Sequence, residues 1–437
     1  MHQSVAVSPF QSGLKGRGWQ LFCGIVAMMA ISSPQYVWAL FTKPLLATLN
    51  VGLPALQITF SILIVLQTAL SPLQGFLIEK FGPRWLLAIG SVLTGCSWVL
   101  ASKVTTVVGL YLTYGLLGGI GTGIIYVGVV GLMVKWFPDR RGFATGMVAA
   151  GYGFGAILTT FPIDAMLKTS GLVQTLQIFG LVIGTVGVAA AFGLRTPSVN
   201  AIALATPEAS SAAVPKSQVS FRPGQMLKTP VFWLLFGMMT MMSTGGLMVI
   251  SQMGAFAKDF GVSTAVVFGL AALPLALTLD RVTNGLTRPF FGWVSDRIGR
   301  EKTMAFAFIL EGCAVLLWLA FRENAVAFVL LSGLVFFGWG EIFSLFPSTL
   351  TDTFGPMHAT TNYGFLYIAQ GVGSVLGGPV AAWMHNYFNS WLPVFYVVAG
   401  LDILTGLLAM VVLRPMRQGW LDRPVAPLAV APLPASA

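Results

Sequence analysis

Four polar residues stand close together in one apolar stretch, and their spacing would place them on one side of a helix. Asp280, Asn284 and Arg288 recur at intervals of four, and Arg281 precedes Arg288 by seven positions. All four then fall within about 100° of the helix circumference. An ion at the centre of a bilayer costs roughly 2.5–3.5 kcal/mol. A chain with 9% charged residues is therefore expected to use the three that lie in this span.

Arg288 has the chemistry of an anion-binding group. Its guanidinium offers two parallel N–H donors to a carboxylate and stays charged in a poorly hydrated cavity. The alternative is that the long side chain reaches the membrane interface and serves only as an anchor. Spacing alone leaves both interpretations open.

Asp280 also has two interpretations. It can form an ion pair with Arg281 or Arg288, or it can bind a proton and couple a transport step to the proton gradient. The ion pair is the expectation that we adopt.

Composition places these residues in a membrane protein. Hydrophobic residues make up 56% of the chain, the mean hydropathy is +0.82, and 50 of 437 residues are glycine. These values exclude a soluble domain and are typical of a helical protein in a lipid bilayer, with room for about twelve spans. The net charge of +10 lies in short loops, so it indicates topology and no nucleic-acid partner.

The residues that usually build metal sites and active sites are scattered. The cysteines and histidines show no CxxC or ligand spacing: Cys23, Cys96, Cys313, His2, His358 and His385. No nucleophile–base pair and no ATP-binding loop are evident. We therefore expect no disulfide, metal or cofactor, and we do not expect an enzyme.

Apolar spans form two sets of six around one long polar segment. We expect a cytoplasmic N-terminus at 1–18, an N-terminal bundle at 19–194, a linker at 195–230, a C-terminal bundle at 231–413 and a disordered, Pro/Ala-rich tail at 414–437. The predicted spans are 19–41, 53–78, 86–102, 106–134, 143–167, 172–194, 231–257, 264–293, 303–321, 324–350, 361–384 and 390–413.

The two sets resemble each other. The segment GFLIEKFGPR at 75–84 is similar to GWVSDRIGR at 292–300, and the first glycines are 217 positions apart. Phe137 and Phe354, in a second pair of turns, have the same separation. This pattern indicates a duplicated half.

The distribution of basic residues predicts orientation. Of 24 Lys and Arg residues, 17 lie in the termini and in the loops on one side, and five lie on the other: Lys43, Lys103, Lys168, Lys258 and Arg322. Positive residues concentrate on the cytoplasmic side. Both termini are therefore expected in the cytoplasm, and we expect a monomer in the cytoplasmic (inner) membrane.

The repeated turns resemble the loop signature of the major facilitator superfamily. The second copy matches it at Gly292, Asp296, Arg297, Gly299 and Arg300. The first copy begins at Gly75 but departs, with Glu79-Lys80 in place of Asp-Arg and Pro83-Arg84 after Gly82. The acid at the end of one helix can pair with basic residues or with a helix N-terminus of the other half, and so hold one side closed. The alternative is a positively charged anchor, and both roles can hold together.

A closer resemblance covers most of 19–415. The chain resembles the oxalate/formate antiporter family, which is related to monocarboxylate transporters. The residues that carry this resemblance are PQYVWAL at 34–40, EKFGPR at 79–84, KWFPDRRGFATG at 135–146, AAGYGFG at 149–155, LKTPVFW at 227–233, RPFFGWVSDRIGR at 288–300, FGWGEIFSLFPS at 337–348 and NYGF at 362–365.

The resemblance implies an all-α fold of twelve transmembrane helices in two pseudo-symmetric six-helix bundles, the major facilitator fold. It also implies a central site for a small carboxylate. Carried over by position, the substrate-binding candidates are Arg288, Gln35, Tyr36, Tyr126, Tyr152, Trp339 and Gln370.

Three positions depart from the family's pattern. Gln370 stands where the family's prototype uses a lysine, Phe343 replaces an aromatic hydroxyl, and Glu341 is an added acid. With one cation left, a short monocarboxylate such as formate, lactate or pyruvate becomes as reasonable a substrate as oxalate. Glu341 can titrate, or it can face a neighbouring helix as a hydrogen-bonded neutral acid.

These observations favour a secondary transporter of small carboxylates that works by alternating access, as an antiporter. The alternative is a proton-coupled monocarboxylate symporter, with protons as a second ligand. A sensor would need a signalling domain, and the loops are too short to hold one.

Overall fold

The computed structural model describes residues 16–198, 214–217 and 219–423. Expectations for 1–15, 199–213 and 424–437, including the disordered end of the tail, lie outside the described residues.

The N-terminal half is entirely helical in its described part. Its elements are α2 (Arg17–Ala30), α3 (Ser33–Tyr36), α4 (Trp38–Leu49), α5 (Leu53–Ala69), α6 (Ser71–Phe81), α7 (Pro83–Ala101), α8 (Val107–Leu110), the π-helical η1 (Tyr111–Leu117), α9 (Gly118–Trp136) and α10 (Arg141–Gly193).

The C-terminal half is helical apart from one short hairpin. Its elements are α12 (Pro223–Met226), α13 (Pro230–Asp259), β1 (Val266–Val267), β2 (Leu270–Ala271), α14 (Ala272–Ile298), α15 (Arg300–Ala320), α16 (Ala325–Trp339), α17 (Ile342–Phe354), α18 (Ala359–Val375), η2 (Leu376–Val380), α19 (Ala381–Phe388), α20 (Leu392–Leu408), η3 (Ala409–Leu413) and α21 (Arg414–Leu421).

These helices account for twelve crossings. In the described part of the chain, eight helices are long and apolar enough to span a membrane, and two bent pairs raise the number to ten. One of the eight, α10, turns at Gly171, where φ is 77° and the chain leaves the helical conformation, so it crosses twice. The twelfth crossing is α14, whose charged residues lower its hydropathy.

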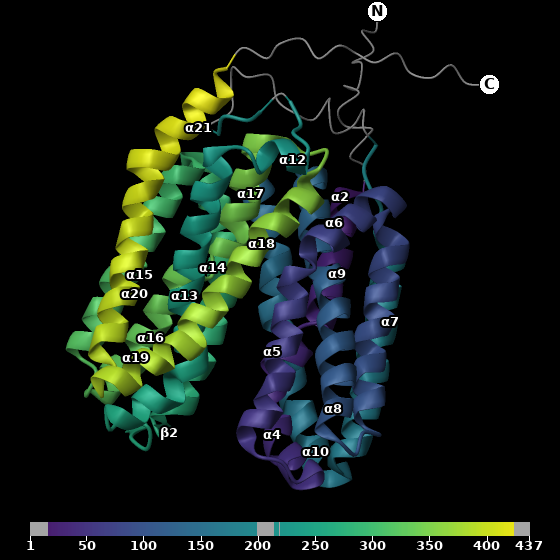
Figure 1. Ribbon diagram of the computed structural model, residues 1–437, viewed down its shortest axis with the longest axis vertical. Helices are drawn as coiled ribbons and strands as arrows, with labels where there is room; N and C mark the ends of the chain where they lie inside the picture. The colour runs from purple at the N-terminus through teal and green to yellow at the C-terminus, as the bar shows by residue number, and fades with distance from the viewer. Residues whose placement is uncertain (1–15, 199–213, 218, 424–437) are drawn as a thin grey trace, which may run out of the picture.

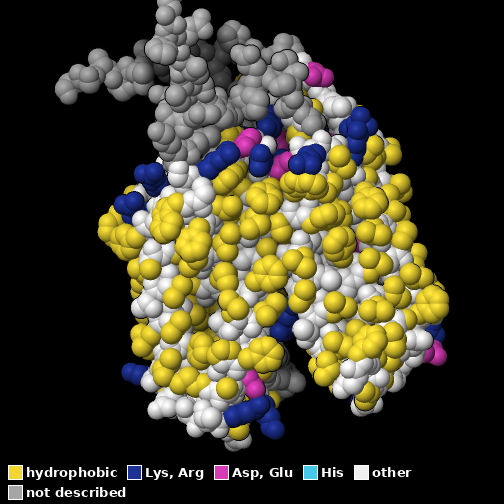
Figure 2. All heavy atoms as spheres, turned by 180° about the vertical axis from the view of Figure 1, so that it is seen from behind, with side chains coloured by type: hydrophobic (Ala, Val, Ile, Leu, Met, Phe, Trp, Pro, Cys, Tyr) yellow, Lys and Arg dark blue, Asp and Glu magenta, His cyan; other side chains and the backbone are white. Residues whose placement is uncertain are grey.

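The two halves meet at one end and part at the other. In Figure 1 the bundles converge at the end that carries α12 and α21, and they diverge at the end that carries α4 and β2. We call these the closed end and the open end. Figure 2 shows hydrophobic side chains across most of one face of the molecule, with Lys and Arg gathered at the closed end. Between the halves, α10 packs along α14 and α6 packs along α18.

One predicted span began too early. The residues from 266 to 271, which we placed in the span 264–293, form the β1–β2 hairpin, and α14 begins at Ala272. Phe268 and Gly269 both have positive φ, at 50° and 80°, which is the conformation of a tight hairpin turn. Apolar composition does not distinguish such a hairpin from a helix.

Part of the predicted linker and tail is packed against the closed end. Ser217 and Phe221 donate their backbone N–H groups to the carbonyls of Asp352 and Phe354, each at 2.8 Å. The predicted tail begins with helix α21, whose Arg417 is buried. These segments therefore belong to the folded C-terminal half.

A break between α16 and α17 shapes the centre of the molecule. A Cβ atom at Gly340 would lie 2.6 Å from the carbonyl oxygen of Asn284, so the close approach to α14 requires glycine. Thr287 donates its hydroxyl to the carbonyl of Phe337, which the break leaves without its helical partner, at 2.5 Å. The break thus fixes the end of α16 beside the polar face of α14.

Candidate functional site

A small cavity lies between the two halves. All seven residues that the resemblance implied line this cavity, four from the N-terminal half and three from the C-terminal half. The complete lining is Gln35, Tyr36, Tyr126, Tyr152, Leu247, Ile250, Arg288, Trp339, Phe343, Tyr367 and Gln370. Leu247, Ile250 and Tyr367 were not predicted.

Arg288 is held from three sides. Its Nε donates to Asn284 Oδ1 at 2.9 Å, and its Nη1 donates to the carbonyl of Ala149, in the other half, at 2.5 Å. The guanidinium carbon lies 4.6 Å from the centroid of the Phe343 ring, a cation–π contact. The side chain is 1% exposed, so it forms part of the cavity wall and does not reach the membrane interface.

Aromatic rings form most of the remaining wall. Tyr126 stacks on Tyr367 with ring centroids 4.8 Å apart, and its ring meets that of Tyr152 edge-on at 5.3 Å. Tyr36 meets Tyr152 edge-on at 5.4 Å. The interlocked rings restrict each hydroxyl to a narrow range of positions.

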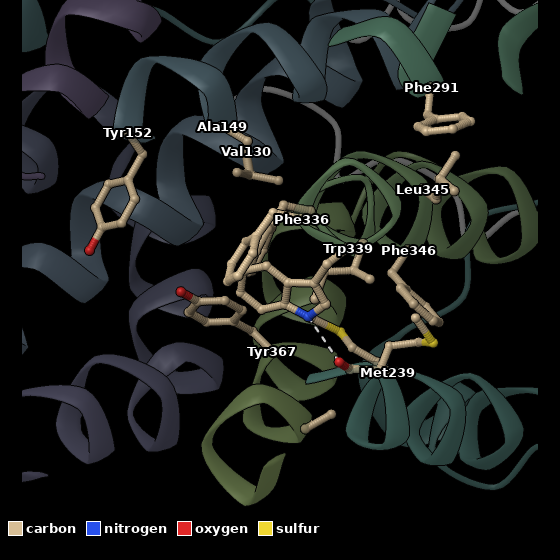
Figure 3. Packing of buried hydrophobic residues seen from close by; sticks show 14 of the residues in the cluster. Val130, Ala149, Tyr152, Met239, Phe291, Phe336, Trp339, Leu345, Phe346 and Tyr367 are labelled. Carbon is tan, nitrogen blue, oxygen red and sulfur yellow. Dashed lines mark hydrogen bonds between the residues drawn. The ribbon is translucent and has the colours of Figure 1, made fainter. Parts of the chain in front are cut away.

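Trp339 is fixed in α16 by a bond and by packing. Its indole Nε1 donates to the carbonyl of Met242 in α13 at 2.9 Å, and Figure 3 draws this bond as a dashed line from the indole nitrogen. The ring lies directly against Gly246, where any Cβ atom would overlap it. Phe343 meets the indole edge-on at 5.5 Å. Figure 3 also shows Tyr367 beside the indole, with its hydroxyl directed away from Trp339 to the side on which Tyr152 lies.

A hydrogen-bonded chain runs behind the tyrosines. Tyr152 donates its hydroxyl to Gln35 Oε1 at 2.5 Å. Gln67 Nε2, from α5, donates to the hydroxyl oxygens of Tyr152 and Tyr367 at 3.5 and 3.4 Å. Gln67 was missed from sequence, although a glutamine within the apolar run ILIVLQTAL is a signal that could have found it.

The ion pair predicted for Asp280 does not form. Asp280 is 4% exposed, and no Lys or Arg nitrogen lies within 4.0 Å of its carboxylate in the described part of the chain. Arg288 turns to Asn284 and Ala149 instead, and Arg281 does not line the cavity. Helical spacing correctly placed Asp280 and Arg288 on one face of α14. It did not predict which groups each side chain would contact.

Glu341 lies at the break between α16 and α17 and is not among the residues that line the cavity. It is fully buried, and its carboxyl oxygens have no hydrogen-bond partner among the described residues. Both alternatives for Glu341, a titrating group and a neutral acid, stay predictions. Glu311 in α15 and Asp402 in α20, in the same bundle, are also buried, and their carboxyl oxygens find no hydrogen-bond partner in the part of the chain that the structure describes.

At the closed end, the two acids of the repeated turns contact helix N-termini of the opposite half. Asp296 accepts the backbone N–H groups of Gly142 and Phe143, at the start of α10, at 3.0 and 2.8 Å. Glu79 accepts the N–H of Thr360, at the start of α18, at 2.9 Å. Free N–H groups at a helix start favour a carboxylate.

The glycines of these turns permit the approach. A Cβ atom at Gly75 would lie 2.6 Å from the carbonyl oxygen of Thr360, and one at Gly292 would overlap the backbone of Gly142. Arg84 and Arg297 are exposed and take no part in this contact. Arg297 lies over the ring of Trp293, 3.9 Å from its centroid.

A buried ion cluster completes the closed end. Asp352, in α17, is fully buried and accepts from Arg141 of the other half at 2.5 Å and from Arg300 Nε at 2.9 Å. Arg300 also pairs with Asp296 at 2.7 Å. Lys216 donates to the carbonyl of Pro138 at 2.7 Å, and burial lowers the pKa of its ammonium from the ordinary 10.5. Arg141 and Asp352 were missed because their partners lie about 50 or more positions away.

Two six-helix bundles that enclose a polar cavity and close over one end define the architecture of a secondary transporter. The sequence profile of the Major Facilitator Superfamily matches residues 21–279 and 275–434. The chain therefore belongs to this superfamily, and the predicted fold is confirmed.

Individual relatives cover nearly the whole chain. It is 32% identical to the oxalate:formate antiporter of Oxalobacter formigenes over 407 residues, which are 93% of this chain and 94% of that protein. It is 25% identical to monocarboxylate transporter 13 of Bos taurus, over 81% of this chain and 79% of that one.

Solved structures share the fold. The transporter FucP in its outward conformation is 14% identical, with a TM-score of 0.62 over 90% of this chain and 97% of that chain. The proton:xylose symporter XylE is 13% identical, with a TM-score of 0.67 over 90% and 94%.

Proposed function

We propose that this protein carries small carboxylate anions across the membrane by alternating access, and that Arg288 binds the carboxylate. The observation that carries the proposal is the charge of the cavity: among its described lining residues Arg288 is the only cation, and none is acidic. A guanidinium in a poorly hydrated cavity binds a carboxylate strongly. The names of the two relatives, an oxalate:formate antiporter and a monocarboxylate transporter, support the same substrate class.

A single cation favours a substrate with a single negative charge. Gln370, which lines the same cavity, can donate and accept hydrogen bonds but cannot neutralise a second carboxylate. Formate, lactate, pyruvate and singly protonated oxalate fit this charge. Oxalate as a dianion would leave one charge without a partner in the cavity.

We infer exchange of one carboxylate for another as the mode of transport. The similarity to an antiporter along 93% of the chain supports this inference. Proton-coupled symport is the second candidate, and the buried Glu341 favours it, because a carboxyl group without a cation or a donor is a natural proton carrier.

We propose that the closed end faces the cytoplasm of a cell whose inner membrane holds the protein as a monomer. The excess of Lys and Arg at this end supports the orientation. Opening this end would require the Asp296 and Glu79 contacts and the Arg141–Asp352 pair to break together.

Transport by purified protein in liposomes tests the proposal. Vesicles are loaded with formate, lactate, pyruvate or oxalate, and uptake of each labelled anion is followed with and without a pH gradient. Exchange predicts uptake that requires an internal anion and ignores the gradient. Gradient-driven uptake into empty vesicles would instead establish symport, and the absence of uptake of all four anions would refute the substrate class.

A further inference from the structure

Gln67 lies outside the cavity but contacts two of its walls. The residue is 2% exposed and stands in α5, in the N-terminal half. Its Nε2 donates to Tyr152 of the same half and to Tyr367 of the other half. Both tyrosines line the cavity, whereas Gln67 does not.

The direction of these bonds follows from the chemistry of the amide. An amide nitrogen donates and cannot accept, so each tyrosine oxygen must accept. Each phenol hydrogen then has to point elsewhere. The hydrogen of Tyr152 goes to Gln35 Oε1, at 2.5 Å. That bond occupies the oxygen of Gln35 and leaves its NH₂ group for the cavity.

Tyr367 follows the same rule with a different outcome. Its hydroxyl oxygen accepts from Gln67, so its hydrogen points away from Gln67. Because the side chain lines the cavity, this hydrogen is available to a ligand there. One buried amide therefore leaves two donors for the cavity, the Gln35 NH₂ and the Tyr367 hydroxyl.

We propose that Gln67 is a positioning residue that makes the neutral wall of the cavity donate hydrogen bonds, and so prepares it for a carboxylate. This inference rests on the proposed function, since it requires an anion in this cavity. Arg288 supplies charge from one side, and the two oriented donors supply neutral hydrogen bonds from the other.

If the amide of Gln67 were rotated so that Nε2 and Oε1 exchanged places, the groups that face the cavity would change from donors to acceptors. Its Oε1 would accept from Tyr152 and Tyr367, and Gln35 would then face the cavity with its oxygen. A cavity lined by acceptors repels a carboxylate. The orientation found here, with Nε2 towards both hydroxyls and Oε1 without a hydrogen-bond partner among the described residues, is the one that favours anion binding.

Two substitutions separate polarity from packing. Gln67→Met keeps the length of the side chain and removes the donor, whereas Gln67→Glu places an acceptor against both hydroxyls. Gln74→Met is the matched control, because Gln74 is a buried glutamine of the same half that donates to the carbonyl of Ile120 and does not line the cavity.

The measurements are KM and maximal rate for labelled formate, lactate and pyruvate in liposomes, with anion binding in detergent followed by tryptophan fluorescence. We expect KM to rise about tenfold in Gln67→Met and about 100-fold in Gln67→Glu, with the maximal rate changed less than threefold. Gln74→Met should keep the wild-type KM. Equal KM in both Gln67 variants, or a fall in rate at constant KM, would overturn the proposal.

A double background shows whether Gln67 acts through the tyrosines. In Tyr152→Phe/Tyr367→Phe protein, adding Gln67→Met should leave KM unchanged, because the hydroxyls it orients are gone. A further tenfold rise would assign Gln67 to packing and contradict the inference. Binding that depends on Arg288 but not on Gln67 contradicts this inference alone, and wild-type protein that binds none of the anions contradicts both proposals.

Discussion

Glu79 and Asp296 stand 217 positions apart and make the same contact in opposite directions across the molecule. Asp296 of the C-terminal half accepts N–H groups at the start of α10, and Glu79 of the N-terminal half accepts N–H groups at the start of α18. The acceptors and the donors are related by the same separation in sequence, since Phe143 and Thr360 are also 217 positions apart. The closed end is thus held by one interaction used twice.

Removing either carboxylate should favour opening of this end. Asp296→Asn and Glu79→Gln should each destabilise the closed conformation by about 1–2 kcal/mol relative to the open one. This changes the ratio of closed to open protein roughly 5–30-fold. The distance between spin labels at Arg84→Cys and Arg297→Cys, exposed positions in opposite halves, reports the change when Cys23, Cys96 and Cys313 are replaced by serine.

Asp139→Asn is the control for this experiment, because Asp139 pairs with Arg17 inside one half. Its distance distribution should match that of the wild type. Unchanged distributions in both Asp296→Asn and Glu79→Gln would show that the two contacts do not hold the end closed.

Arg288→Ala should abolish transport without loss of folded protein. Truncating one partner of a buried charge pair costs roughly 2–5 kcal/mol, so uptake should fall on the order of 100-fold or more. Arg288→Lys keeps the charge but loses the bond geometry to Asn284 and Ala149, and a large loss is expected there also. Arg322→Ala, at a half-exposed position, serves as the control. Wild-type uptake in both Arg288 variants would contradict the assignment of Arg288 to the binding site.

Gln370→Lys should shift selectivity towards dianions. The new ammonium would line the same cavity as Arg288 and supply the second positive charge that the cavity lacks. Competition of unlabelled oxalate against labelled formate measures the shift, and we expect at least a tenfold gain for oxalate. Unaltered competition would mean that charge in the cavity does not decide the substrate.

Gly246→Ala should impair the protein through Trp339. A methyl group at this position overlaps the indole, so the ring must leave the bond that it makes to Met242. Overpacking of this kind costs about 1–3 kcal/mol. The melting temperature in detergent and the uptake rate should both fall. Gly254→Ala, on the same helix with open space around it, should lower neither.

Asp352→Asn should destabilise the closed end strongly. It leaves Arg141 and Arg300 buried without their shared carboxylate, which costs about 3–5 kcal/mol. Asp164→Asn removes an exposed pair with Lys168 and should cost no more than about 0.5 kcal/mol. Melting temperatures of the two variants give the comparison, and similar values would contradict a structural role for Asp352.

Much of the fold could be predicted from sequence because membrane spans are a matter of composition and length. The duplicated turns added the relation between the halves, and family resemblance placed seven residues that do meet at one cavity. The hairpin at 266–271 was taken for helix because its apolar residues carry no periodic signal over so short a run.

The contacts of individual polar side chains were beyond prediction. The face shared by Asp280 and Arg288 followed from helical spacing, but the choice of Arg288 for the carbonyl of Ala149 depends on how closely α10 approaches α14. Gln67 and Tyr367 lie 300 positions apart, and Arg141 and Asp352 lie 211 apart. Pairings of this kind depend on how the two bundles pack against each other, and this packing cannot be read from a single sequence.

The solitary guanidinium of the cavity also gives the carrier an electrical signature. A single guanidinium favours one monoanion at a time, and the exchange of one monoanion for another moves no net charge and generates no current. Exchange of a dianion for a monoanion would move one charge per cycle, and the membrane voltage would then drive it in one direction. Recordings on a supported membrane would therefore distinguish the valence of the substrates before their identities are known.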